Sequence, residues 1–210
     1  MEISSAVTQI IAADGGLTDN SRDVALNHDV RVVQSPQGRG LQIKAGIGLA
    51  NGDVILILHA DCLAATNAFE RILKSLAADA RVVGGPFEMQ FEPQSPKTRF
   101  IAFLNNMRTT LSGISFGDQA QFFRRAALDP MGGFPPMMLM EDVELSLRLK
   151  EVGRLVFLRD GIVVSDRRWH GCRFAGNLLT VFYLFTRYLA ERRWGTPGRL
   201  MRKYYDIYYR

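Results

Sequence analysis

The first half of the chain alternates short apolar runs with amphipathic segments. Four runs have the length and apolar character of buried strands: 7–13, 30–34, 54–58 and 81–84. Three further segments have the spacing of helices: 17–27, 41–50 and 68–78. Short aliphatic strands separated by helices are typical of a mostly parallel sheet that is covered on both faces. The pattern therefore predicts an α/β fold.

The second half is less regular. Strand patterns occur at 87–91, 119–124, 155–158 and 162–164. Helical patterns cover 100–111 and 141–152, and Gly153 stands where a left-handed helix cap is expected. From 174 to 209 the chain has helical character, interrupted at 195–197. We therefore expect one domain over residues 1–165 and a C-terminal helical extension over residues 166–210.

The composition is that of an ordinary globular protein. The chain has 210 residues, of which 47% are hydrophobic and 22% charged, so it can bury the core of one domain. Its net charge of +5 is concentrated late in the sequence, and charge alone does not choose between phosphates, nucleic acid and anionic membranes. The cysteines form no disulfide framework or CxxC site, and the N-terminal segment lacks the pattern of a secretory signal. A cytoplasmic location is the expectation.

Two aspartates follow apolar runs of the first half. Asp14 begins a turn with two glycines, and Asp61 follows the run VILIL within the sequence VILILHADC. In parallel α/β sheets, ligands bind outside the carboxyl ends of the strands. Asp61 is thus a candidate metal ligand, but a polar turn at a strand end explains it as well. Both explanations stay open at this point.

A further acidic pair, Glu141 and Asp142, begins the helical pattern at 141–152. Carboxylates are favoured in the first turn of a helix because they offset the helix dipole, and this explanation needs no function. The other explanation is a general base that removes a proton from a hydroxyl nucleophile. The preceding segment GGFPPMMLM is apolar and rich in Gly and Pro, so it could form one wall of a substrate pocket.

Four motifs, taken together and in order, resemble those of glycosyltransferase family 2 over roughly residues 10–164. ADGGLTD (13–19) is similar to the turn VDDGSTD of that family, and KAGIGLANGD (44–53) to its N-x-G-x-x-x-A-x-G-D helix, with Lys44 in place of Asn. His59-Ala60-Asp61 matches the metal-binding D-x-D, and Glu141-Asp142 the ED motif of the base. The segments GRGLQ and LHAD are similar to segments of a bacterial subgroup, the arsenosugar-type or radical-SAM-associated transferases.

The resemblance implies a GT-A fold, with a Rossmann-like, mostly parallel sheet, and an inverting, metal-dependent sugar transfer to an acceptor hydroxyl. By this resemblance, Asp14 hydrogen-bonds the nucleobase of a UDP- or GDP-sugar, and Arg39 lies near the nucleotide. Asp61 ligates Mn²⁺ or Mg²⁺, and Asp142, within the pair with Glu141, is the general base. The acceptor is a small molecule or a lipid, and no nucleic acid is expected as a partner.

Three other positions have a purely structural explanation as well as a functional one. His59 replaces an acidic residue of the family motif and is expected to have a supporting role more often than a ligating one. Asp118 could contact the donor sugar or the acceptor, or belong to a turn before a strand. Arg168 could lie over the diphosphate, or be one of two surface arginines beside a packed Trp.

The chain also departs from the family pattern, because it reaches the Asp-Gly turn without the strand and helix that normally precede it. In this fold the absent strand is central, so its neighbours are expected to expose edges that invite pairing with another chain, and a homodimer is the expectation. The alternative function is that of a catalytically impaired homologue that acts as a nucleotide-binding or protein-interaction module.

The apolar stretch LLTVFYLF (178–185) lies near several arginines. It is too short to span a membrane. Burial in the core or in a dimer is the common explanation of such a stretch, and contact with the inner face of the membrane is the other hypothesis.

Overall fold

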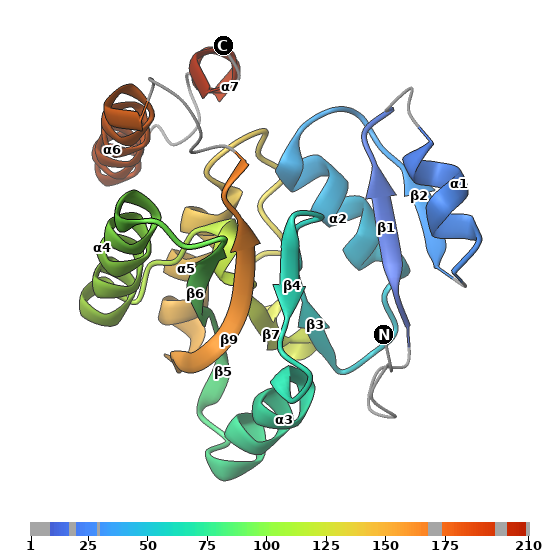
Figure 1. Ribbon diagram of the computed structural model, residues 1–210. Coiled ribbons are helices and arrows are strands. Elements are labelled where there is room, and N and C mark those ends of the chain that lie inside the picture. Colours follow the sequence, from blue (N-terminus) through green and yellow to red (C-terminus); the bar gives the residue numbers. More distant parts are fainter. Residues whose placement is uncertain (1–8, 17–19, 29, 168–173, 196–200, 209–210) are drawn as a thin grey trace.

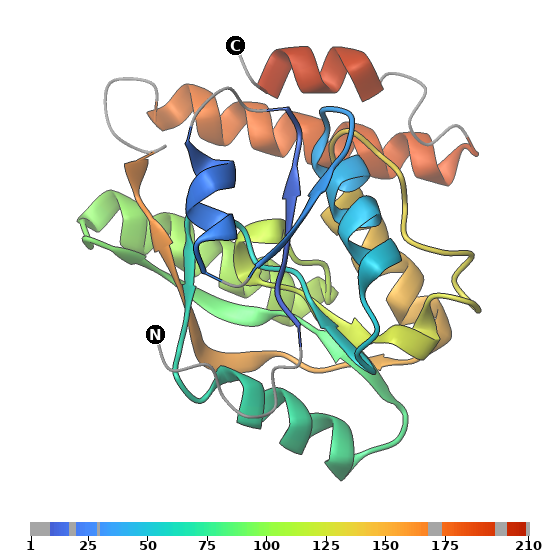
Figure 2. The ribbon, with the colours of Figure 1, turned by 90° about the vertical axis from the view of Figure 1, so that its right-hand side faces the viewer.

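The computed structural model describes residues 9–16, 20–28, 30–167, 174–195 and 201–208. Within these ranges the chain forms small sheets surrounded by helices, which confirms the α/β class (Figure 1). Figure 2 shows helices α6 (Phe174–Arg193) and α7 (Met201–Tyr208) running across one end of the molecule, and α3 (Ala68–Ala78) at the opposite end.

The described strands form three hydrogen-bonded sheets. The first pairs β1 (Ile11–Asp14) with β2 (Arg31–Gln34) in parallel. The second has the order β3 (Val54–Leu56), β7 (Phe122–Arg124), β5 (Val82–Gly85), β8 (Arg154–Leu155). The third has the order β4 (Cys62–Ala64), β9 (Leu158–Ser165), β6 (Phe87–Glu92).

The pairing within these sheets is mixed, not mostly parallel as the apolar runs predict. Strand β7 lies between β3 and β5 and is antiparallel to both, and β4 is antiparallel to β9. Only the pairs β1–β2, β5–β8 and β6–β9 are parallel among the described residues. Strand β7 thus enters its sheet against the direction of both neighbours, which the local pattern does not reveal.

Strands β1 and β3 each have one open edge in the part of the chain that the structure describes. Strand β1 hydrogen-bonds only to β2, and β3 only to β7. Pairing of these edges with a second copy of the chain stays a prediction.

The helices largely follow the predicted segments. They are α1 (Ser21–Leu26), α2 (Arg39–Leu49), α3, α4 (Pro96–Ser112), α5 (Glu141–Val152), α6 and α7. Helix α4 begins four residues before the predicted start, because Ser95 and Thr98 form a reciprocal capping box and Pro96 occupies the first turn. None of the described helices is long and apolar enough to cross a membrane.

Gly153 does not form the left-handed cap that the sequence predicts. Its φ is 178° and its ψ is −169°, an extended conformation open to any residue. A glycine fits here for another reason: a Cβ atom would overlap the side chain of Val83 on β5. The end of α5 is therefore fixed by close packing on the sheet.

Three groups of buried side chains form the core. One lies among β6, β7, β9 and α3, with Phe87 and Phe122 fully buried at 5.7 Å between ring centroids. A second lies between β3 and α5. The third joins α6 and α7 to the segment before α5 and includes Leu139, Met140, Val143, Leu184, Tyr188 and Tyr204. This third group fixes the position of the acidic pair at the start of α5.

Candidate active site

The first turn of α5 presents two buried carboxylates. Glu141 is 1% exposed and Asp142 5% exposed. Asp142 Oδ2 accepts a hydrogen bond from the backbone N–H of Gly117 at 2.8 Å, and Oδ1 accepts one from Val143 at 2.8 Å. Met140, just before the helix, has a φ of 63°, which is uncommon for a residue with a side chain. Its burial in the third core group holds this turn in place.

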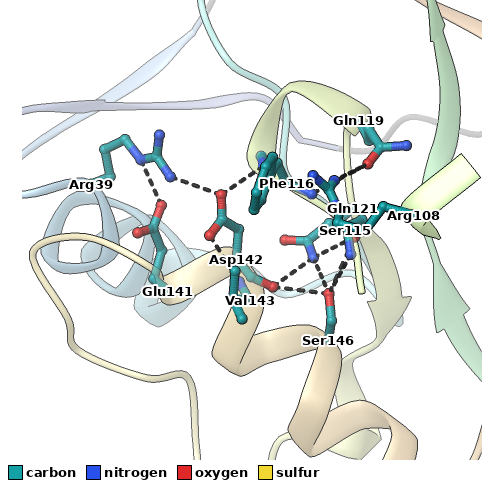
Figure 3. Close-up of polar contacts among 11 residues, drawn as sticks. Arg39, Arg108, Ser115, Phe116, Gln119, Gln121, Glu141, Asp142, Val143 and Ser146 are labelled. Carbon is teal, nitrogen blue, oxygen red and sulfur yellow. Dashed lines mark hydrogen bonds and ion pairs between the residues drawn. The ribbon is translucent and has the colours of Figure 1, made fainter. Parts of the chain in front are cut away.

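Arg39 joins the start of α2 to this carboxylate pair (Figure 3). Its Nε atom donates to Glu141 Oε1 at 2.7 Å, and its Nη2 atom donates to Asp142 Oδ2 at 2.8 Å. Burial opposes the charge on Arg39, but the two carboxylates outweigh it and raise the pKa of the guanidinium well above its usual value. Arg39 is therefore a permanent cation between two acids.

Gly40 makes this close approach of α2 to α5 possible. A Cβ atom at Gly40 would overlap the backbone oxygen of Met137 and lie 2.9 Å from Cβ of Glu141. The G-R-G sequence around Arg39 thus has a physical reason in this structure: the second glycine lets the arginine reach the acidic pair. The sequence resemblance places Arg39 near the nucleotide, but it does not predict this ion pair.

The carboxylates of Glu141 and Asp142 differ in how many of their oxygen atoms have hydrogen-bond partners. Burial raises the pKa of Glu141 to about 7, and the charge of Asp142 adds to this, while Arg39 opposes it. Its Oε2 atom has no hydrogen-bond partner among the described residues. Near neutral pH, Glu141 is thus a group that exchanges a proton, whereas both oxygens of Asp142 accept hydrogen bonds.

A buried polar network supports Asp142 from behind (Figure 3). Gln121 Nε2 donates to the backbone oxygen of Asp142 at 2.9 Å, to Ser146 Oγ at 2.9 Å and to Ser115 Oγ at 2.8 Å. Ser146 Oγ donates to the same backbone oxygen at 2.9 Å. All of these side chains are buried, so their groups need these partners. Sequence reasoning missed this network because no motif marks it.

Arg108 of α4 holds the turn that carries Asp118. Its guanidinium lies 3.4 Å from the ring centroid of Phe116 and donates from Nη2 to Gln119 Oε1 at 3.0 Å. Burial lowers the pKa of Arg108 to about 10, so the side chain stays charged at neutral pH. Asp118 lies between these two partners in a short 3₁₀ helix, Gly117–Gln119.

Asp118 is an unusual acid in this turn. Its Oδ1 atom is buried without a hydrogen-bond partner among the described residues. Burial raises the pKa of Asp118 to about 6, with Arg108 opposing and Asp142 adding to the shift. A buried carboxylate oxygen without a donor is a group that a cation or a ligand hydroxyl would satisfy.

Asp61 lies close to Asp118, at the start of β4. Cys62 Sγ is 3.7 Å from Asp61 Oδ1 and 4.0 Å from the backbone oxygen of Asp118. The Asp61 side chain is exposed, and its backbone oxygen is fixed by the N–H of Ser165 at 3.0 Å. Cys62 itself is a buried thiol, as expected of a small packed side chain.

His59 packs on the same turn. A Cβ atom at Gly117 would overlap the His59 ring, so the two residues are in direct contact. Burial lowers the pKa of His59 to about 4, and the charge of Arg39 contributes in the same direction. The imidazole is therefore neutral at physiological pH. A supporting role for His59 stays a prediction.

The match to a known family covers the part of this region that precedes the acidic pair of α5. The family model described as glycosyl transferase family 2 matches residues 3–133. The chain belongs to glycosyl transferase family 2. The arsenosugar-type subgroup has no support beyond the sequence phrases, and a search of curated proteins gives no significant match.

Solved structures agree with family 2 at the level of the fold. The chain is similar to TarS from S. aureus, with a TM-score of 0.58, 14% identity, and coverage of 75% of this chain and 31% of that one. It is also similar to glucosyl-3-phosphoglycerate synthase (GpgS) from Mycobacterium tuberculosis in complex with Mn²⁺, UDP and glucosyl-3-phosphoglycerate. There the TM-score is 0.51, the identity 14%, and the coverage 76% of this chain and 60% of that one. At such low identity these likenesses show the GT-A fold alone. The chain spans less than two thirds of either neighbour.

Two carboxylates of this cluster offer oxygen atoms to a metal ion. Among the described residues, no group of three or more His, Cys, Asp and Glu side chains is arranged to hold a metal ion. A Mg²⁺ ion that also binds substrate phosphates needs only one or two carboxylates from the protein. Asp61 offers an exposed carboxylate, and Asp118 a buried oxygen without a partner. This oxygen-only pair fits a hard cation that shares its coordination with phosphates.

Two residues assigned by resemblance to family 2 are not joined to this cluster by the contacts described here. Asp14 ends β1 in the separate two-stranded sheet, and its Oδ1 accepts a hydrogen bond from Gly16 N at 3.0 Å. Strand β1 is not hydrogen-bonded to β3 or β4, and the nucleobase role of Asp14 stays a prediction. Arg168 lies outside the described residues.

Helix α7 adds a residue that the sequence reasoning did not single out. The ring centroid of Tyr208 lies 5.9 Å from the guanidinium carbon of Arg39. Tyr204 of the same helix is buried in the third core group. The C-terminal helix therefore borders the cluster. A tyrosine at the end of a predicted helix gives no sequence signal for such a position.

Proposed function

We propose that the protein transfers a sugar from a nucleotide-sugar donor to an acceptor hydroxyl, with inversion and with dependence on a divalent metal. The observation that carries this proposal is the convergence of Arg39, Glu141 and Asp142 beside Asp61 and Asp118. Membership of glycosyl transferase family 2 supports the reaction class. It does not favour the alternative of a catalytically impaired homologue.

Asp142 is the general base in this proposal. A carboxylate in contact with the acceptor hydroxyl accepts its proton while the acceptor oxygen bonds to the anomeric carbon. The bond from that carbon to the diphosphate oxygen breaks on the opposite side, so the configuration inverts. The buried network of Gln121 and Ser146 fixes the backbone beneath Asp142, which keeps the carboxylate in place for this step.

Arg39 has two roles in the proposal. Without a donor, it donates a hydrogen bond to Asp142 Oδ2, so this oxygen is occupied and does not face an acceptor hydroxyl. A nucleoside diphosphate presents oxygens that match the planar guanidinium better than one carboxylate oxygen does. We expect Arg39 to turn toward the diphosphate when the donor binds, which frees Asp142 for the acceptor. Donor binding would then precede base activation.

Asp61 is the proposed metal ligand, with Asp118 as its neighbour. Mn²⁺ or Mg²⁺, when bound here, would offset the negative charge that accumulates on the departing diphosphate. The GpgS neighbour is described with Mn²⁺ and UDP-glucose, which supports a UDP-sugar as the first donor to test. A GDP-sugar is the other candidate. Asp14 is proposed to contact the nucleobase and Arg168 the diphosphate, both by family resemblance.

The acceptor and the setting are also proposals. The acceptor class is a small molecule or a lipid with a free hydroxyl, and the setting is the cytoplasm. The open edges of β1 and β3 are the proposed contact of a homodimer, since unpaired edges readily accept another strand.

Isothermal titration calorimetry tests the proposed function directly. UDP-glucose and GDP-mannose are titrated into the full chain with and without Mn²⁺, and binding of one donor is expected to need the metal. Asp61→Asn should abolish the binding of the donor that Mn²⁺ promotes. Asp53→Asn is the matched control, since Asp53 is an exposed aspartate at the other end of β3. Folded protein that binds neither donor in the presence of Mn²⁺ would contradict the proposal.

A further inference from the structure

Helix α4 has an exposed apolar stripe that no neighbour within the described chain covers. Its members are spaced by three or four residues, and their exposed fractions are 50%, 60%, 41% and 79%: Phe100, Phe103, Met107 and Leu111. The opposite side of α4 packs on β6, with Ile101 buried. Four large apolar side chains on one solvent-facing stripe are unusual for a monomeric soluble protein and mark an interaction surface.

Helix α6 has a second stripe of the same kind. Leu179, Phe182 and Tyr183 are 68%, 65% and 51% exposed, and Trp194, just after the helix, is 75% exposed. The other side of α6 is buried, with Leu184 and Tyr188 at 0% exposure. The apolar run at 178–185 is thus split: one face packs in the core and the other faces outward.

The two helices lie side by side at one edge of the molecule in both views (Figures 1 and 2). Arg108 of α4 lies 5.9 Å from the ring of Phe185 of α6, and Phe116 packs edge-on against the same ring with 5.7 Å between centroids. We define the α4–α6 surface as the two exposed stripes: Phe100, Phe103, Met107, Leu111, Leu179, Phe182 and Tyr183. The two stripes thus belong to neighbouring helices.

The exposed charged side chains of α4 and α6 themselves are all basic. Helix α4 contains Lys97, Arg99 and Arg108 and no acidic residue. The only acidic residue in α6 is Glu191, which is buried, whereas Arg187 and Arg193 are exposed. A second copy of the same surface would bring like charges together, which disfavours a self-pairing contact. The complementary partner is an anionic surface.

We propose that the α4–α6 surface binds the face of an anionic lipid bilayer. A helix with an aromatic and aliphatic stripe and basic flanks lies in the plane of the membrane interface, with its apolar side chains among the lipid headgroups and upper acyl chains. Aromatic side chains, here Phe100, Phe103, Phe182, Tyr183 and Trp194, favour this interfacial depth. Basic residues nearby add attraction to anionic lipids.

This surface is connected to the candidate active site through few residues. Arg108, which lies beside Phe185, also holds Gln119 and stacks on Phe116, the residue before Gly117. Bilayer binding would therefore place Arg108, and with it the turn that carries Asp118, close to the lipid headgroups. The inference goes beyond the proposed function, and its test does not depend on donor binding or turnover.

Vesicle flotation of the full chain tests the inference. The protein is expected to float with vesicles that contain phosphatidylglycerol and not with pure phosphatidylcholine vesicles. The double variant Arg99→Glu with Phe103→Asp, both exposed on α4, should weaken binding to the anionic vesicles about tenfold or more, since it reverses a charge and removes an anchor.

A matched double variant on α3 provides the control. Leu73→Asp with Lys74→Glu makes the same change of charge and polarity at exposed positions on the opposite end of the molecule. It should bind vesicles like the wild type, and unchanged thermal unfolding checks that both variants fold. Absence of binding to anionic vesicles, or equal loss in both doubles, overturns the inference. Analytical ultracentrifugation without lipid gives a further test. A dimer that is dissociated by the double variant on α4, and not by the double variant on α3, also overturns the inference.

Discussion

Arg39 Nη2 lies 2.8 Å from Asp142 Oδ2, although the two residues are 103 positions apart in the sequence. The same guanidinium binds Glu141, so one cation connects the start of α2 to both acids at the start of α5. The Arg39 side chain is 22% exposed and those of the acids are 1% and 6% exposed. This partly buried ion triad links the structure of the site to its chemistry.

Loss of Arg39 should be costly for stability. In Arg39→Met, two buried carboxylates lose their counter-charge, and we expect the free energy of unfolding to fall by about 3 kcal/mol, the usual cost of breaking a buried ion pair. Urea unfolding followed by circular dichroism measures this change. Arg81→Met is the matched control, because Arg81 pairs with Asp79 at 3.0 Å but its side chain is 80% exposed. An exposed pair contributes about 0–1 kcal/mol, so equal effects of the two variants would contradict a buried triad.

The assignment of the base predicts a separation of binding from turnover. Asp142→Asn keeps the shape of the side chain and an acceptor oxygen for Gly117 N–H, but it cannot take up a proton. We expect turnover with a metal-bound UDP-sugar to fall about a hundredfold or more, while the Kd of the donor stays within a few-fold. Calorimetry and product formation measure the two quantities. Retained turnover would assign the base to another residue.

Much of this fold is encoded locally. Helices α3 and α5 begin and end at the predicted residues, because their apolar spacing and the acidic first turn of α5 are properties of short segments. Strand β4 escaped prediction, because it has only three residues and is defined by its pairing with β9, a hundred positions later in the chain. The mixed direction of the strands depends on the same kind of distant pairing.

The residues of the candidate site likewise fall into those that the sequence reveals and those that it does not. Asp61, Asp118, Glu141 and Asp142 were found because they stand at turns and helix starts. Gln121 and Ser146 were not found, because polar residues inside a strand region and a helix look like surface positions until their burial is known. The ion pair of Arg39 depends on the packing of α2 against α5, which no sequence motif describes.

That packing gives opposite expectations for two glycines of α2. Gly40→Ala places a methyl group against the backbone oxygen of Met137, so α2 must move away from α5. We expect it to destabilise the protein by about 1–3 kcal/mol and to weaken donor binding through Arg39. Gly48→Ala meets no atom within 4 Å and should stabilise the helix by about 0.5–1 kcal/mol. Thermal unfolding of both variants compares them, and similar Tm changes would argue against close contact at Gly40.

The raised pKa of Glu141 makes stability depend on pH in a defined direction. Burial raises this pKa from 4.5 to about 7, so the folded state binds more protons than the unfolded state between these values. Stability contributed by this group is therefore present below pH 4.5 and is lost as pH rises to about 7. Glu141→Gln keeps an acceptor for Arg39 Nε but does not titrate in this range.

The pH profile of that variant isolates the group, because all other acids titrate in both proteins. The free energy of unfolding of Glu141→Gln minus that of the wild type should increase from about pH 4.5 to about pH 7 and then level off. Urea unfolding at several pH values measures the difference. A difference that decreases with pH would mean that the ion pair with Arg39 outweighs burial and holds the pKa of Glu141 below its ordinary value. In that case Glu141 would stay ionised beside Asp142, and Arg39 would be less available to a diphosphate.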